Sequence, residues 1–253
     1  MRRFVLGALA IAAALVVAAV SAGCGDDDDA SPRLVVSAAS SMTAALSGCS
    51  PDFSGADVRL SFAGSDELAA QIRQGVKPDV YAAANTKLPD ELNKEGLLSK
   101  PVEFATNELA VAVPKDSEIQ SLDDLAGEGL KLAIGSESVP IGSYTREVLS
   151  RLPKAESDAI LANVRSNEPD VNGIVGKLTQ GAADAGFVYV TDVNAAGDKL
   201  QAVKLPSDLD PNATYAAGVV RGAKQPGEAR AFVDGLTNGA CADALARAGF
   251  GAP

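Results

Sequence analysis

Hydrogen-bond donors gather at four turns of the sequence, each placed between an apolar run and a helix-like pattern. These turns are Ser37–Thr43, Phe62–Leu68, Ile134–Ser143 and Ser166–Val171. A helix that begins at such a turn has unpaired backbone N–H groups and a positive dipole end. Several helix starts that converge form an anion site without any cationic side chain. Serine, asparagine and aspartate at helix starts are also ordinary N-caps, so capping alone explains any single turn.

Side chains that catalysis and metal binding often use are scarce. The chain of 253 residues contains three cysteines and no histidine. Without an imidazole, Ser-His and Cys-His nucleophiles and His-containing zinc or copper sites are excluded. A Ser-Lys pair is the nucleophilic option that remains, and no Ser-x-x-Lys motif lies at a strand–helix turn. We therefore expect no catalytic residue, no cofactor and no enzymatic activity.

Short β-branched runs alternate with helical patterns from Arg33 onward. We expect strands at 34–36, 58–62, 79–81, 109–113, 130–134, 187–190 and 216–220. The clearest helix is 170–180, in which apolar residues from Val171 to Leu178 recur at i, i+3, i+4 and i+7. This alternation predicts an α/β fold with parallel sheets covered on both faces. In open α/β sheets ligands bind at the carboxyl ends of the strands, where the four turns lie.

The charge balance is acidic. There are 22 Lys+Arg against 33 Asp+Glu, a formal net charge of -11. Proteins that bind nucleic acid rely on clustered lysine and arginine to neutralise phosphates, so we expect no nucleic-acid partner. The hydrophobic fraction of 47% and the charged fraction of 22% are those of an ordinary globular protein. The length allows one or two domains.

Residues 1–23 have the anatomy of an export signal. Arg2 and Arg3 precede an uncharged stretch, 4–20, that leads to small residues before Cys24. The segment resembles a bacterial lipoprotein signal, in which the cysteine is acylated and becomes the new N-terminus. Ser21 departs from the Leu or Val that is usual in that motif. A transmembrane anchor is the competing interpretation, because the apolar stretch approaches the ~20 residues that span a bilayer.

Residues 24–32 read as an acidic tether with four consecutive aspartates at 26–29. They lack the spaced ligands and the turn glycine of a calcium loop, which favours a solvated spacer over a metal site. Removal of the signal takes away two arginines, so that 20 Lys+Arg face 33 Asp+Glu and the formal charge becomes -13.

Two cysteines remain if Cys24 carries lipid. Outside the cytoplasm Cys49 and Cys241 are candidates for a disulfide between an N-terminal and a C-terminal helix. Two separate buried thiols are the alternative, since sequence alone does not fix the distance between the Cα atoms.

The four turns and the segments around them resemble the periplasmic molybdate-binding proteins of ABC importers. The resemblance spans nearly all of 33–253. Its motifs, in chain order, are AASSMT at 38–43, FAGS at 62–65 followed by LAAQI at 68–72, GVKPDV at 75–80, VPIGSY at 139–144, Asp170-Val171, GFVY at 186–189 with Asp192, and Gly249-Phe250. Each motif alone is weak, whereas the set in this order and spacing is specific.

The resemblance implies a two-lobed α/β fold of the periplasmic-binding-protein type. Each lobe would be a mainly parallel sheet flanked by helices, and two crossover strands near 107 and 217 would form the hinge. Lobe I would then comprise 33–107 with 218–253, and lobe II would comprise 108–217.

In that family two serine hydroxyls, a tyrosine hydroxyl and backbone amides hold the oxyanion. The matching positions are the serines Ser41 and Ser65, the amides of Ile141 and Val171, and the tyrosine Tyr189. Two residues depart from the pattern. Ile141 replaces the usual alanine, and Asp66 stands where a small hydroxyl residue is common. A tyrosine on a buried strand is also explained as a core residue.

The resemblance implies that the ligand is molybdate and also tungstate, held through the oxygens with no protein atom on the metal. A fully deprotonated dianion only accepts hydrogen bonds, so a site made of donors fits it. Hydrogen phosphate carries a proton that such a site leaves unpaired. Size must separate molybdate from the smaller sulfate.

The expected function is capture of molybdate by a monomer anchored through lipid at Cys24 to the outer face of the bacterial cytoplasmic membrane. The bound anion would then pass to the permease of an ABC importer. A binding protein for another tetrahedral oxyanion, such as sulfate or phosphate, is the first alternative. An exported hydrolase without histidine is the alternative from another class.

Overall fold

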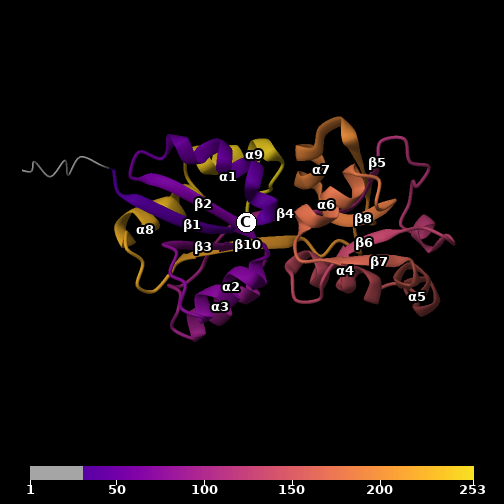
Figure 1. The fold of residues 1–253 in the computed structure, drawn as a ribbon, viewed down its shortest axis with the longest axis horizontal. Coiled ribbons are helices and arrows are strands. Elements are labelled where there is room, and N and C mark those ends of the chain that lie inside the picture. The colour runs from indigo at the N-terminus through magenta and orange to yellow at the C-terminus, as the bar shows by residue number, and fades with distance from the viewer. Residues whose placement is uncertain (1–30) are drawn as a thin grey trace, which may run out of the picture. The chain divides into compact units, whose positions relative to one another are not determined.

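The computed structural model describes residues 31–253 (Figure 1). The expected signal peptide, the lipidation site Cys24 and the four aspartates of the tether lie outside the described residues. Within 31–253, no helix combines the length and the apolar character needed to span a bilayer.

The first lobe is built on a sheet with the strand order β2-β1-β3-β10-β4. Its strands are β1 (Arg33–Ala39), β2 (Asp57–Ala63), β3 (Val80–Ala83), β4 (Val102–Asn107) and β10 (Ala213–Val219). β1 pairs in parallel with β2 and β3, whereas β10 is antiparallel to β3 and β4. The helices of this lobe are α1 (Thr43–Cys49), α2 (Ser65–Arg73), α3 (Lys87–Lys94), α8 (Pro226–Gly235) and α9 (Ala240–Ala248), with short 3-10 turns at Ser40–Met42 and Ser50–Asp52.

The second lobe repeats this plan with the strand order β7-β6-β8-β5-β9. Its strands are β5 (Leu109–Pro114), β6 (Leu132–Gly135), β7 (Val164–Glu168), β8 (Ala185–Tyr189) and β9 (Leu200–Lys204). β6 pairs in parallel with β7 and β8, and β5 is antiparallel to β8 and β9. The helices are α4 (Pro140–Ser150), α5 (Lys154–Ala162), α6 (Val171–Thr179) and α7 (Val190–Ala196), with 3-10 turns at Asp123–Ala126 and Gly197–Lys199.

The two-lobed α/β fold is therefore confirmed. Each sheet is mainly parallel, as expected, with one antiparallel strand inserted between two strands of the common direction. That strand is β10 in the first sheet and β5 in the second. Both strands follow directly after the chain has crossed from the other sheet, so they run opposite to the strands of the βα units.

The chain changes sheet at two places. The first is Glu108, the single residue between β4 and β5. The second is the segment 205–212 between β9 and β10. The expected division between 217 and 218 falls inside β10, which pairs with β3 and β4 from Ala213 onward. Pairing along the whole strand keeps 213–217 in the first sheet.

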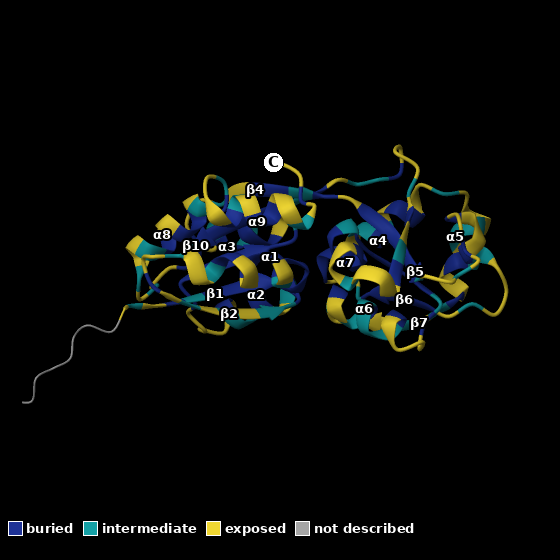
Figure 2. Cartoon of the chain, turned by 90° about the horizontal axis from the view of Figure 1, so that it is seen from above, coloured by how far each residue is buried: buried dark blue, intermediate teal, exposed yellow. Residues whose placement is uncertain are grey.

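Both sheets are covered on their faces, so their strands form the core (Figure 2). The outer faces of the helices are exposed, whereas β3, β5 and β8 are buried almost throughout. In the first lobe, Cys49 of α1 and Cys241 of α9 form a disulfide with their Cα atoms 5.0 Å apart. This bond joins the first helix of the lobe to its last.

Candidate functional site

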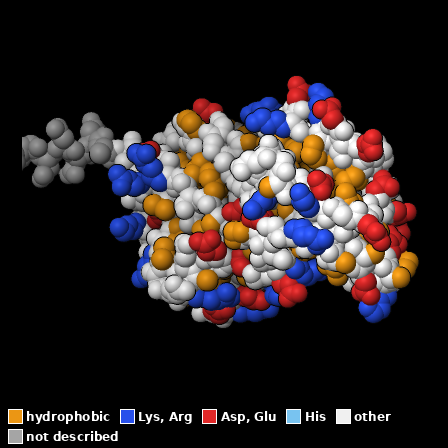
Figure 3. All heavy atoms as spheres, turned by 45° about the vertical axis from the view of Figure 1, so that its right-hand side comes forward, with side chains coloured by type: hydrophobic (Ala, Val, Ile, Leu, Met, Phe, Trp, Pro, Cys, Tyr) orange, Lys and Arg blue, Asp and Glu red, His pale blue; other side chains and the backbone are white. Residues whose placement is uncertain are grey.

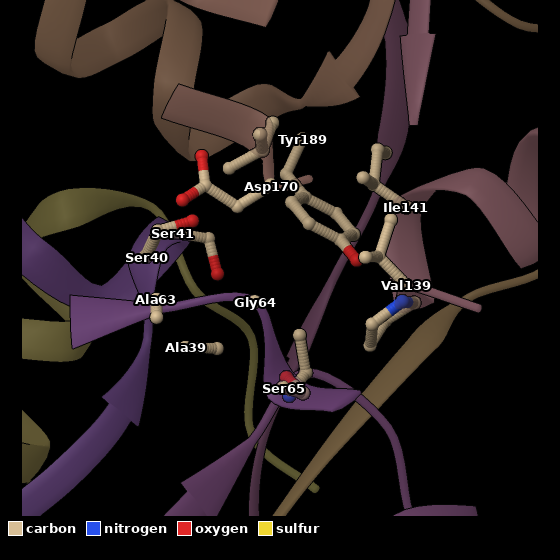
Figure 4. Close-up of a pocket in the computed structure, with 13 residues that line it drawn as sticks. Ala39, Ser40, Ser41, Ala63, Gly64, Ser65, Val139, Ile141, Asp170 and Tyr189 are labelled. Carbon is tan, nitrogen blue, oxygen red and sulfur yellow. The ribbon is translucent and has the colours of Figure 1, made fainter. Parts of the chain in front are cut away.

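A small cavity lies between the two lobes, at the carboxyl ends of β1 and β2 and the starts of α4 and α6 (Figure 4). Its lining consists of Ala39, Ser40, Ser41, Ala63, Gly64, Ser65, Ala84, Val139, Pro140, Ile141, Asp170, Val171 and Tyr189. All five ligand-binding residues expected from the sequence are in this set. Ser41 and Ser65 come from the first lobe, and the other three come from the second.

The cavity is the size of a small ion. The space open to the centre of a water molecule is about 20 Å³. One water needs at least about 10–15 Å³ by this measure, whereas sites for drug-sized ligands are about 300–1,000 Å³. The site therefore suits one compact polyatomic ion and excludes a sugar, an amino acid or a peptide in this conformation.

Ser41 lies in the 3-10 turn that follows β1. Ala39 occupies the N-cap position of that turn, and no side chain caps it. Capping thus does not explain Ser41. Its Oγ lies 2.9 Å from the hydroxyl of Tyr215, which reaches it from β10 on the same sheet. A buried tyrosine therefore holds the serine in place from behind the cavity.

Ser65 is the first residue of α2, with Gly64 as the N-cap. The backbone N–H of Ala84 donates to Ser65 Oγ at 3.1 Å, and the hydroxyl of Tyr81 donates to the Ser65 carbonyl at 2.7 Å. An N–H only donates, so Ser65 Oγ is the acceptor in the first bond. The hydroxyl proton of Ser65 is left to donate into the cavity.

Two backbone amides of the second lobe lie at helix starts. Ile141 follows Pro140, which begins α4, and Val171 is the first residue of α6. First-turn amides have no acceptor within their own helix and lie at the positive end of its dipole. The bulk of Ile141 is accommodated by Gly135, since a Cβ added there would lie 2.7 Å from Ile141 Cγ2.

Asp170 is the one acidic residue in the cavity lining. It is the N-cap of α6, and its Oδ1 accepts a hydrogen bond from Gly173 N at 3.0 Å. Its carboxylate lies on the side of Ser40 and away from Ser65 (Figure 4). Among the four polar turns expected from the sequence, only the turn before α6 has an N-cap side chain bonded to a first-turn amide. The helices that follow the other three turns have no side-chain cap.

Tyr189 ends β8 and is 1% exposed. Its hydroxyl is buried and has no hydrogen-bond partner among the described residues. Burial, and after it the neighbouring Tyr215 hydroxyl, raises the pKa of this phenol well above its ordinary value, so the group is neutral and carries a proton to donate. In Figure 4 the hydroxyl projects to the Val139 side of the cavity. A ligand that accepts a hydrogen bond would satisfy it.

Behind Tyr189, Asp192 is also fully buried. Its Oδ2 accepts a hydrogen bond from the backbone N–H of Tyr189 at 2.9 Å and fixes the start of α7. The pKa of Asp192 is raised to about 8, chiefly by burial and in smaller part by the nearby Asp170, against the lowering by that hydrogen bond. The neutral carboxyl therefore predominates at pH 7, which places no full negative charge behind the site.

Asp66, a departure from the expected pattern, is not in the cavity lining. It lies in the first turn of α2, and its Oδ1 is buried without a hydrogen-bond partner among residues 31–253. A Cβ added to Gly64 would lie 2.9 Å from this oxygen. The carboxylate thus lies close behind the cavity wall.

Among residues 31–253, no lysine and no arginine lines the cavity. Charged side chains of both signs are instead spread over the outer surface (Figure 3). Surface charges are screened over about 8 Å at physiological ionic strength, whereas enclosed dipoles act at full strength on a bound ion. The arrangement can bind an anion through hydrogen bonds from neutral hydroxyls and backbone amides.

Sequence reasoning did not single out Ser40, Gly64, Ala84 and Asp170 as site residues. Ser40, Gly64 and Asp170 stand beside expected residues in the same motifs, so the motifs held a usable signal. Ala84 follows β3 and carries no polar side chain. Its contribution is a backbone N–H to Ser65, which only the folded chain shows.

Known proteins resemble this chain over most of its length. The model of the family described as bacterial extracellular solute-binding protein matches residues 34–251. The molybdate-binding protein ModA of Mycobacterium tuberculosis is 34% identical over 96% of this chain and 97% of its own. ModA of Escherichia coli is 30% identical over 86% of this chain and 88% of its own.

The fold is also that of a solved structure, the periplasmic molybdate-binding protein of Azotobacter vinelandii. The TM-score is 0.78 at 22% identity, with 87% of this chain and 99% of that chain covered. At this identity the likeness concerns the fold alone. The family model and the relative at 34% identity show the family as well as the fold. The chain belongs to the family of bacterial extracellular solute-binding proteins.

Proposed function

We propose that this protein captures molybdate, and tungstate with it, in the cavity between its lobes. One observation carries the proposal: the buried hydroxyl of Tyr189 has no partner among residues 31–253, in a cavity where serine hydroxyls and helix-start amides are further donors. A dianion that only accepts hydrogen bonds satisfies every one of these donors. The one carboxylate in the lining, Asp170, is held by the backbone N–H of Gly173. The ModA relatives, named as molybdate-binding proteins, support the same ligand.

The ligand set proposed is Ser41, Ser65 and Tyr189 through their hydroxyls, and Ile141 and Val171 through their backbone amides. Molybdenum would be held through the oxygens of the oxyanion, with no protein atom on the metal. Hydrogen phosphate would have to place its proton against a donor, which costs about 1–3 kcal/mol or more for a buried charged ligand.

Binding would couple to closure of the two lobes. Donors from both lobes line the cavity, so the anion is fully bound only when the lobes are together. The crossings at Glu108 and 205–212 are the proposed hinge, which assigns 33–107 with 213–253 to lobe I and 108–212 to lobe II. The closed monomer would then deliver the anion to an ABC permease, without catalysing any reaction.

The place of action would be the outer face of the cytoplasmic membrane. Membership of an extracellular family supports export. Acylation at Cys24 with the acidic tether at 24–32 would keep the protein near the permease. Metabolic labelling with a fatty acid, compared between the natural chain and Cys24→Ser, tests the anchor, and equal labelling of both would contradict it.

The ligand is tested by calorimetry and thermal shift with molybdate, tungstate, sulfate and phosphate. We expect molybdate and tungstate to bind with a Kd between about 1 nM and 1 μM and to raise the melting temperature. Sulfate and phosphate should give small shifts at the same concentrations. A larger shift with sulfate or phosphate would replace the proposed ligand, and no shift with any of the four would reject an oxyanion site.

A further inference from the structure

We propose that Asn107 and Tyr215 form a donor chain that fixes the direction of the Ser41 hydrogen bonds, so that the site selects fully deprotonated oxyanions. The donor chain is defined as Asn107, Tyr215 and Ser41. The inference rests on the oxyanion function proposed above and names the groups that set its selectivity. Asn107 and Tyr215 act as positioning residues, since neither lines the cavity.

The three residues come from distant parts of the sequence and meet behind the cavity. Asn107 is the last residue of β4, next to the first crossing between the lobes. Its Nδ2 donates to Tyr215 Oη at 3.4 Å, and Tyr215 Oη lies 2.9 Å from Ser41 Oγ. Asn107 is 2% exposed and Tyr215 is 0% exposed, so water does not compete for these bonds.

The proposed direction starts from the Asn107 amide. An amide NH₂ only donates, so Tyr215 Oη accepts from Asn107. Either hydroxyl can donate in the bond between Tyr215 and Ser41, and with Asn107 donating to Tyr215 Oη we assign the phenolic proton to Ser41 Oγ. In this direction Ser41 Oγ accepts, and its own proton remains for the cavity. Through Tyr215, the orientation of the Asn107 amide thus makes the Ser41 hydroxyl a donor to the ligand.

The Nδ2 of that amide is also bonded in the other lobe, whereas its Oδ1 is buried with no hydrogen-bond partner among residues 31–253. Asn107 Nδ2 also donates to Thr191 Oγ1 at 2.8 Å. Thr191 belongs to α7, which follows Tyr189 in the second lobe. Thr191 is 4% exposed, so water does not compete for this hydrogen bond. The Asn107 amide, which directs the Ser41 hydroxyl in the first lobe, is therefore also hydrogen-bonded to Thr191 of the second lobe.

Ser65 is directed in the same sense by a different group. The backbone N–H of Ala84 donates to its Oγ, which leaves the Ser65 proton for the cavity. With Tyr189 also unpaired, three hydroxyls then face the ligand as donors. A deprotonated oxyanion meets all of them, whereas a protonated one must set its O–H against a donor. If the donor chain ran the other way, Ser41 would donate to Tyr215 and present a lone pair to the cavity. That lone pair could accept the O–H of a protonated oxyanion.

The test is a double-mutant cycle on molybdate affinity, measured by calorimetry on the full chain in mild detergent. Tyr215→Phe keeps the ring, which packs edge-on against Tyr189 with centroids 5.8 Å apart, and removes only the hydroxyl. We expect it to weaken binding about tenfold in the natural chain and less than about twofold in a Ser41→Ala chain. Equal losses in both chains would overturn the donor chain, because Tyr215 would then act through packing.

Tyr81→Phe is the matched control. It also removes a buried tyrosine hydroxyl, but one that donates to the Ser65 carbonyl. Its effect on molybdate affinity should be the same with and without Ser41. Asn107→Ala repeats the cycle one step further from the ligand and should show the same dependence on Ser41. This second variant decides the matter should Tyr215→Phe fail to fold, as judged by circular dichroism.

A second readout separates the donor chain from the function on which it rests. Sulfate and hydrogen phosphate are similar in size and both carry two charges, but only hydrogen phosphate has a proton. Tyr215→Phe should narrow the preference for sulfate over hydrogen phosphate by about fivefold, measured by competition, since Ser41 is then free to accept. An unchanged preference would refute the donor chain, whereas failure of the natural chain to bind molybdate would refute the proposed function instead.

Discussion

Gly64 of the first lobe lies against the carbonyl oxygen of Pro169 in the second lobe, so close that a Cβ added to Gly64 would lie 2.5 Å from that oxygen. Gly64 also lines the cavity and precedes Ser65. A methyl group at this position cannot fit while the lobes are together. The absence of a side chain at 64 is therefore a requirement of the closed form.

Gly64→Ala should weaken molybdate binding by more than about tenfold, because the binding-competent closed form becomes rare. The melting temperature of the ligand-free protein should change little, since the open form loses the clash with Pro169. It keeps only the 2.9 Å approach to Asp66 Oδ1, the end of a side chain that can move. Calorimetry measures the affinity, and small-angle scattering measures whether molybdate still compacts the protein. Gly48→Ala is the control, because a Cβ at Gly48 in α1 meets no atom within 4 Å. Full affinity and full compaction in Gly64→Ala would contradict closure at this contact.

Tyr189→Phe should separate binding from stability. The hydroxyl has no partner among the described residues, so its removal should cost the ligand-free protein no stability. Binding of molybdate should fall by about tenfold or more, as expected for loss of a hydrogen bond to a charged ligand. Tyr81→Phe should lower the melting temperature without ligand, because that hydroxyl donates to Ser65 O at 2.7 Å. A drop in stability for Tyr189→Phe would mean that its hydroxyl is bonded within the protein.

Local pattern alone predicted less of the site than the family resemblance did. The alternation of strands and helices with four polar turns predicted an α/β protein that could bind an anion. The resemblance supplied the five proposed binding residues, and the structure places all five around one cavity. The strands expected from apolar runs are present, including the partly buried edge strand β2.

Other features depend on pairing between distant segments. The strands β4, β7 and β9 were not among the expected strands. They are edge strands, they are only partly buried, and their sequences VEFATN, VRSNE and LQAVK mix polar with apolar residues. The place of β10 in the first sheet depends on its register with β3 and β4. The contact between Ser41 and Tyr215 joins residues 174 positions apart. No local pattern encodes these relationships.

Asp66→Asn should strengthen molybdate binding several-fold. The carboxylate lies close behind the cavity wall with its Oδ1 unbonded within 31–253, so its charge repels a dianion in a water-poor region. The effect should persist when salt is added, because ions screen a buried charge much less than an exposed one. Glu67→Gln makes the same charge change at the exposed neighbour and should alter affinity by less than about twofold. Titration calorimetry at low and high salt measures both variants, and weaker binding in Asp66→Asn would show that Asp66 helps to hold the site together.

Loss of the bond between Cys49 and Cys241 should destabilise the protein without altering its affinity. The bond spans 192 residues, and the chain-entropy account gives up to about 5 kcal/mol for a loop of this length. Neither cysteine lines the cavity. Denaturant unfolding of the Cys49→Ser, Cys241→Ser chain measures the loss, and calorimetry at a temperature where the chain stays folded measures the affinity. Equal stability before and after reduction of the natural chain would contradict a role for the bond.

Stability should fall as pH rises, because of the buried carboxyl of Asp192. Its pKa is raised from 3.8 to about 8 in the folded protein, chiefly by burial, so the folded state holds a proton that the unfolded state has lost. The stabilisation from this group is fully present below about pH 4 and is lost as pH rises through about 8. Asp192→Asn retains an oxygen that can accept from Tyr189 N and does not titrate, so its melting temperature should depend less on pH over this range. Thermal unfolding at pH 5 to 9 compares the two chains, and parallel curves would show that Asp192 is not the group responsible.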